Sequence, residues 1–73
     1  MRQVDLARMS TQIAQFFEPY PEEEAVAGVA EHLTSFWDPG MRHELGAIQA
    51  AGTPPLHPLV TKAVLRLASG SPS

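Results

Sequence analysis

The sequence predicts an all-α protein, a compact bundle of four short helices. Apolar residues recur at spacings of three and four in four segments, which is the period of a helix with one buried face. The seven prolines stand in clusters between these segments, and proline interrupts helix interiors. No segment alternates polar and apolar residues for long enough to be a strand, and no Asn-Gly or Asp-Gly hairpin signal occurs.

The first helix is expected over about residues 4–17. Its predicted apolar stripe consists of four residues at helical spacing: Leu6, Met9, Ile13 and Phe16. Adjacent side chains on a helix point about 100° apart, so only one of Phe16 and Phe17 can be fully buried. Phe17 is therefore either a core residue beside the following loop or an exposed docking residue.

The second helix is expected from near Pro21 to about Ser35. Its first turn carries three consecutive glutamates, residues 22–24, where negative charge meets the positive end of the helix dipole. We favour this interpretation over an acidic binding patch. Gly28 lies in the interior, at a cost of up to about 1 kcal/mol relative to alanine. A small residue there would allow another helix to approach closely.

The third helix should begin at Asp38-Pro39, because aspartate is a favoured N-cap and proline suits the first helical position. Gly52 is a natural C-terminal stop. The fourth helix should begin at Pro58. Residues 1–68 are thus expected to form a single helical domain, followed by a disordered tail over residues 69–73.

Composition disfavours several classes of protein. Eight acidic and five basic residues give a formal net charge of −3, which argues against nucleic-acid binding. No apolar run approaches the roughly 20 residues that cross a bilayer, and a secretory signal is not evident, so we expect a cytoplasmic protein. A chain of 73 residues without cysteine has only a modest core and no disulfide. Efficient packing, a partner or a homodimer would have to stabilise it.

No catalytic, cofactor-binding or metal-binding residue is predicted. A cysteine nucleophile is impossible, and neither a Gly-x-Ser-x-Gly elbow nor a phosphate-binding glycine loop occurs. His32, His43 and His57 lie on different predicted elements and show no metal-ligand spacing.

The most unusual segment is residues 36–42, Phe-Trp-Asp-Pro-Gly-Met-Arg. In one interpretation its aromatic residues close the core and Asp38 caps the third helix. In the other, Trp37, Met41 and Arg42 present a binding hot spot, a role in which Trp and Arg are enriched. Both can hold, because one ring of the aromatic pair can point inward and the other outward. The candidate partner-binding residues are Phe17, Trp37, Asp38, Pro39, Met41 and Arg42.

At this segment the sequence resembles the delta subunit of cytoplasmic, NAD-dependent formate dehydrogenases that contain molybdenum or tungsten. The resemblance covers nearly the whole expected domain, and its most specific part is Phe36-Trp37-Asp38-Pro39 with Met41-Arg42. The remaining matches are Arg8-Met9, Gln12-Ile13-Ala14, Phe16-Phe17, Ala25 to Ala30, His32-Leu33, Pro58-Leu59-Val60 and Ala63. The family usually has arginine where this chain has Gly40, so one charged contact with a partner is in doubt.

The resemblance implies a non-catalytic accessory role and binding to the large molybdenum-containing subunit. That subunit would hold the bis-molybdopterin guanine dinucleotide (bis-MGD) cofactor and iron–sulfur clusters, and other subunits the FMN and the NAD site. This chain would bind none of them and would support assembly, stability or cofactor maturation. The alternatives are a transient maturation chaperone for the apo large subunit and a homodimeric helical interaction module.

The hot-spot interpretation predicts that Trp37→Ala weakens partner binding more than Glu23→Ala. Pull-down or surface-binding measurements of both variants test it, with thermal unfolding measured alongside because Trp37 is also a core candidate. Equal affinities for the two variants would contradict the prediction.

Overall fold

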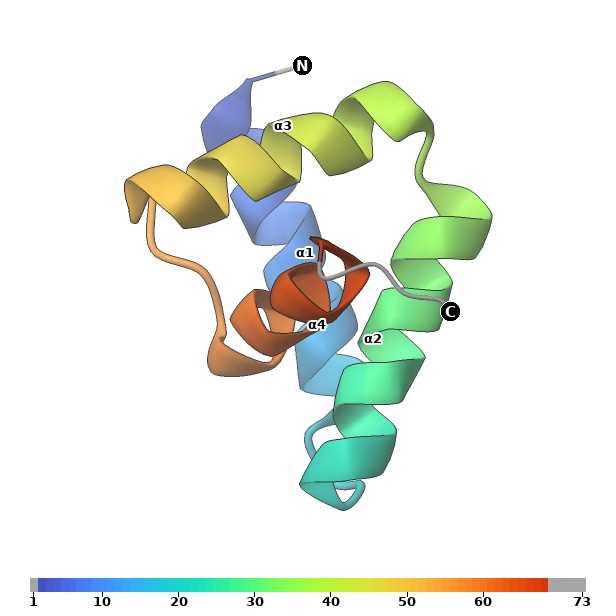
Figure 1. The fold of residues 1–73 in the computed structure, drawn as a ribbon. Coiled ribbons are helices and arrows are strands. Elements are labelled where there is room, and N and C mark those ends of the chain that lie inside the picture. Colours follow the sequence, from blue (N-terminus) through green and yellow to red (C-terminus); the bar gives the residue numbers. More distant parts are fainter. Residues whose placement is uncertain (1, 69–73) are drawn as a thin grey trace.

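Four α-helices make up the computed structural model, which describes residues 2–68 (Figure 1). They are α1 (Gln3–Phe17), α2 (Glu22–Phe36), α3 (Pro39–Ala51) and α4 (Pro58–Ala68). The described residues contain no strand, so the predicted all-α bundle is confirmed. The expected tail over residues 69–73 lies outside the described part of the chain.

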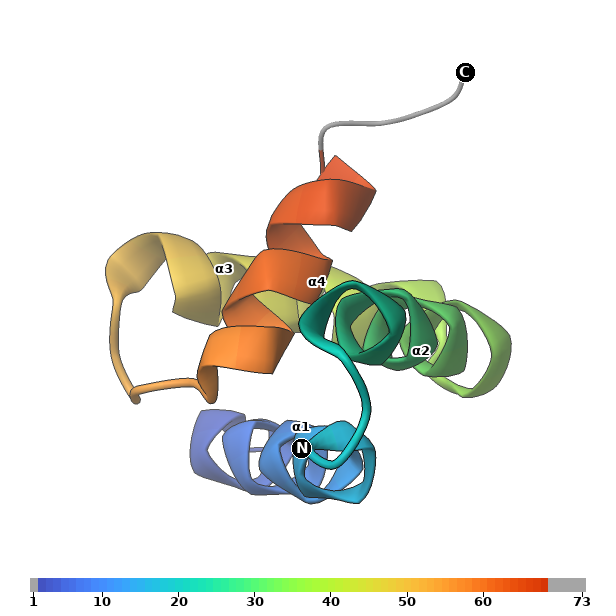
Figure 2. The ribbon, with the colours of Figure 1, turned by 90° about the horizontal axis from the view of Figure 1, so that it is seen from below.

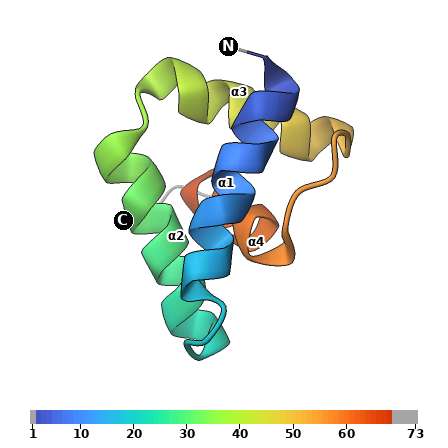
Figure 3. The same cartoon turned by 180° about the vertical axis from the view of Figure 1, so that it is seen from behind.

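Helix α4 stands in the middle of the bundle, with α1, α2 and α3 around it (Figure 1). Its closest neighbour is α2. Seen from below, α4 rises away from α1 between α2 and α3, and its last turn projects beyond them (Figure 2). From behind, α1 crosses in front of α3 and α4 (Figure 3). No helix within residues 2–68 is long and apolar enough to span a bilayer.

The core lies where the four helices meet. Its largest fully buried apolar side chains are Leu6, Val29, Leu33, Leu45, Ile48 and Val60. Buried alanines on α1, α2 and α4 let the helix backbones approach closely. Ser10 is the one buried polar residue among those described. Its hydroxyl donates a hydrogen bond to the Ala7 carbonyl at 2.8 Å, so its burial does not leave the hydroxyl without a partner.

The expected burial of Phe16 in the stripe of α1 is wrong. Phe16 is 68% exposed, whereas Phe17 is half-buried and packs against the core. The reason is the helical period, because at about 100° per residue Phe16 lies about 80° around the helix from Leu6 and Phe17 only about 20°. Met9 and Ile13 flank the buried face and are partly buried. Phe17 is therefore the core residue of the two.

Phe17 also explains the glycine inside α2. A β-carbon built on Gly28 would lie 2.5 Å from Cε1 of Phe17, closer than side-chain atoms can approach. Gly28 thus leaves room for the phenyl ring between α1 and α2, as expected for a small residue at a close approach. The stabilisation from this packing offsets the weak helix propensity of glycine.

Gly28→Ala should destabilise the protein by about 1 kcal/mol, because the overlap with the ring outweighs the gain in helix propensity. In a Phe17→Ala background the same change should stabilise it by about 0.5–1 kcal/mol, since only the propensity gain remains. Urea unfolding of the four proteins in this double-mutant cycle checks both signs. The same effect of Gly28→Ala in both backgrounds would show that the ring does not require the glycine.

Candidate partner-binding surface

The turn between α2 and α3 is built by reciprocal capping. Asp38 is the N-cap of α3, where its Oδ1 accepts a hydrogen bond from the Met41 backbone N–H at 2.8 Å. Pro39 follows at the first helical position, where a missing N–H costs nothing. The predicted start of α3 is therefore confirmed.

Arg42 caps the other side of this turn. Its Nη1 donates to the carbonyl of Trp37 and, at 3.2 Å, to that of Thr34. A longer contact of 3.4 Å reaches the Leu33 carbonyl. The last carbonyls of a helix lack intrahelical partners, and the last turn of α2 has no basic residue of its own. The guanidinium expected to face a partner thus first stabilises the end of α2.

Trp37 belongs to the core and not to the surface. It is 5% exposed and continues the buried line of Val29 and Leu33 at steps of four residues. Phe36 is 75% exposed, and its ring lies 4.7 Å from that of His32. The aromatic pair therefore points one ring inward and one outward, as expected. Any effect of Trp37→Ala on binding will act largely through the fold, since such truncations cost about 3–5 kcal/mol.

The predicted candidates do not form one site. Asp38 and Pro39 are exposed at the α2–α3 turn, and Met41 is half-buried against the core beside them. Phe17 is the last residue of α1, next to the α1–α2 turn, and its ring lies over Gly28 in the middle of α2. There the rings of Phe17 and Tyr20 are 5.8 Å apart, and Phe16 meets Phe17 edge-on at 5.1 Å.

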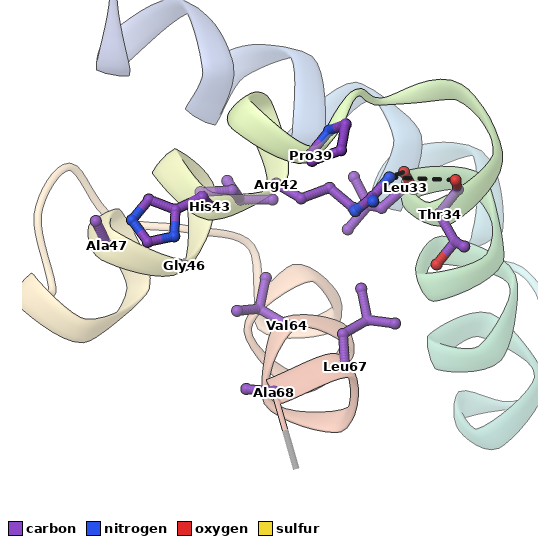
Figure 4. Close-up of a pocket in the computed structure, with 11 residues that line it drawn as sticks. Leu33, Thr34, Pro39, Arg42, His43, Gly46, Ala47, Val64, Leu67 and Ala68 are labelled. Atoms are coloured by element: carbon purple, nitrogen blue, oxygen red, sulfur yellow. Dashed lines mark hydrogen bonds between the residues drawn. The ribbon is translucent and has the colours of Figure 1, made fainter. Parts of the chain in front are cut away.

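An apolar groove lies beside the α2–α3 turn, and an open, charged depression lies between α2 and α4. The groove has a volume of about 590 Å³ and lies between the end of α2, one side of α3 and the last turns of α4 (Figure 4). Its lining comprises Leu33, Thr34, Pro39, Arg42, His43, Leu45, Gly46, Ala47, Val64, Leu67 and Ala68. Of the predicted candidates, Pro39 and Arg42 line it.

Sequence reasoning missed most of the groove. Leu67 is 39% exposed although it continues the apolar face of α4, because the last turn of α4 projects beyond its neighbours. Gly46 lies within α3, and a β-carbon built on it meets no atom within 4 Å. A glycine inside a helix was a visible signal, but only the fold shows that its open side faces the groove.

The three histidines are far from forming a common site. His57 contacts Glu18 at 2.6 Å through Nε2, and its Nδ1 accepts from the Leu59 backbone N–H at 3.0 Å. His32 lies against Phe36, and His43 lines the groove. Among residues 2–68 no three His, Asp or Glu side chains come together as a metal ligand set.

Asp38→Ala should lower the free energy of unfolding by about 1 kcal/mol, because the amides at the start of α3 lose their acceptor. Asp38→Asn keeps an acceptor oxygen and should cost less than about 0.5 kcal/mol. Chemical denaturation of the two variants measures both. An equal loss in Asp38→Asn would show that charge, and not the cap, is what matters.

Comparison with known protein families gives one match. The sequence profile described as NADH-dependent formate dehydrogenase delta subunit FdsD matches residues 5–64, which include nearly all of α1, all of α2 and α3, and most of α4. Searches of curated proteins and of solved structures gave no match. Because the profile spans most of the 73 residues, the chain belongs to the family of NADH-dependent formate dehydrogenase delta subunits.

Proposed function

We propose that this chain is a non-catalytic accessory subunit that binds the large, molybdenum-containing subunit of a cytoplasmic NAD-dependent formate dehydrogenase. Bound there, it supports assembly, stability or cofactor maturation. The observation that carries the proposal is membership of the delta-subunit family over residues 5–64.

The surface of the chain supports a docking role. Phe16, Phe36 and Leu65 expose large apolar side chains, and the groove adds further apolar surface. Such surface is a usual mark of protein–protein contact in a small domain. A partner that binds only the folded chain would also stabilise it by mass action.

In this proposal the redox chemistry belongs to the other subunits. The chain has no cysteine, so it has no thiolate with which to ligate an iron–sulfur cluster. Its sequence also lacks a phosphate-binding glycine loop for a nucleotide. We therefore place bis-MGD with molybdenum or tungsten, the clusters, FMN and NAD on the larger subunits of the complex.

Affinity purification of the tagged chain from its host tests the proposal. We expect the large subunit to co-purify at fixed stoichiometry, with molybdenum or tungsten found by elemental analysis. Recovery of mostly metal-free large subunit would instead favour a transient maturation chaperone. Absence of every formate dehydrogenase subunit, together with a concentration-dependent melting temperature, would contradict the proposal and favour a homodimeric module.

A further inference from the structure

We propose that the groove between α2, α3 and α4 holds a short amphipathic helix of the partner subunit, with an acidic residue placed to pair with Arg42. The inference rests on the proposed function and adds to it the surface used and the chemistry of the segment bound. Four features of the groove lead to it.

The first feature is the character of the lining. Leu33, Leu45, Val64 and Leu67 give it an apolar floor and wall, and Arg42 and His43 supply its basic groups. The chain has eight acidic residues, and none of them lines the groove. An apolar segment with negative charge therefore complements this surface better than a neutral or basic one.

The second feature is Gly46. Glycine inside a helix costs about 1 kcal/mol relative to alanine. Gly28 has a partner that explains it, because the ring of Phe17 fills the space over its backbone. Gly46 has none among the described residues, and the open space over it belongs to the groove. With Ala47 and Ala68 alongside, Gly46 lets the backbone of a second molecule come close to α3 (Figure 4).

The third feature is the unused half of the Arg42 guanidinium. Only Nη1 donates to the carbonyls that end α2. Arginine carries five N–H donors, and those on Nε and Nη2 have no acceptor among residues 2–68. Arg42 is half-buried and already held in place by its capping bonds, so little side-chain entropy remains to be lost on binding. A carboxylate is the acceptor that suits this planar fork.

The fourth feature is the shape of the groove. The described residues offer no sheet edge for an added strand, and no Phe, Tyr or Trp lines the groove to bind a polyproline segment. Helix-in-groove binding is the common mode of peptide recognition that uses an apolar groove between helices. Along α3 the lining runs from Pro39 to Ala47, about 12 Å, which accommodates about two turns of a helix. Residues 69–73, Ser-Gly-Ser-Pro-Ser, lack the large apolar side chains to occupy it.

Blocking the groove tests the inference. Gly46→Trp fills the groove from a position where an added β-carbon would meet no atom within 4 Å. Ala27→Trp, on an exposed position of α2 away from the groove, is the matched control. Binding is measured by surface immobilisation against formate dehydrogenase purified from a host strain that lacks this chain. We expect affinity to fall by about tenfold or more for Gly46→Trp and to stay within about twofold for Ala27→Trp.

A second pair of variants tests the charge. His43→Glu places a carboxylate on an exposed position of the groove and should weaken binding by about tenfold, whereas His43→Lys should preserve it. Circular dichroism melting of all four variants shows that each is folded. Unchanged affinity for both His43 variants would overturn the acidic character assigned to the bound segment.

A photo-crosslinker identifies the occupant. Benzoylphenylalanine at Ala47 should crosslink to a partner segment with helical apolar spacing and at least one Asp or Glu. Crosslinking to a second copy of this chain, or to a segment without these features, would overturn the assignment.

If the unmodified chain binds the enzyme and Gly46→Trp binds equally well, the groove is not the interface and the proposed function stands. If the unmodified chain does not bind, the proposed function itself fails.

Discussion

The turn between α2 and α3 is the constraint on which the rest of the structure depends. Two residues separate the helices, and each helix end leaves several backbone groups without partners. Asp38 satisfies the start of α3, and Arg42 reaches back to the end of α2. Trp37 lies between the two caps and enters the core. These contacts set the direction in which α3 leaves α2, and hence how α3 crosses α1 and α4.

The groove follows from that crossing. Helix α4 occupies the centre of the bundle, but its last turn extends past α2 and α3 (Figure 2). The other three helices do not enclose all of its apolar face, so Val64 is buried while Leu67 remains accessible. A chain of this length has little core to spare, and apolar surface left uncovered by its own helices is available to a second protein.

The residues most specific to the family resemblance serve the fold first. Trp37 is core, Asp38 caps α3, and Arg42 caps α2 through Nη1, the one guanidinium nitrogen with an acceptor among residues 2–68. In the proposed docking mode, contact with a partner falls to neighbouring residues held in place by this turn, such as Phe36 and the lining of the groove. Gly40, where the resemblance predicts arginine, is exposed on the same turn, and a β-carbon built on it would lie 3.3 Å from the capping Oδ1 of Asp38.

The sequence by itself determined the features that local chemistry controls. Pro39, Gly52 and Pro58 mark helix ends because proline and glycine restrict or permit particular backbone angles, and Gly52 indeed has a φ of 78°. Apolar spacing identified the four helices. The tertiary structure fixed the centre of each helix's buried face, and with it which ring of each aromatic pair is buried. The tertiary structure also brought the Arg42 guanidinium to backbone carbonyls up to nine residues earlier in the chain. It formed the groove as well, because the walls of the groove come from three helices that the sequence does not place side by side.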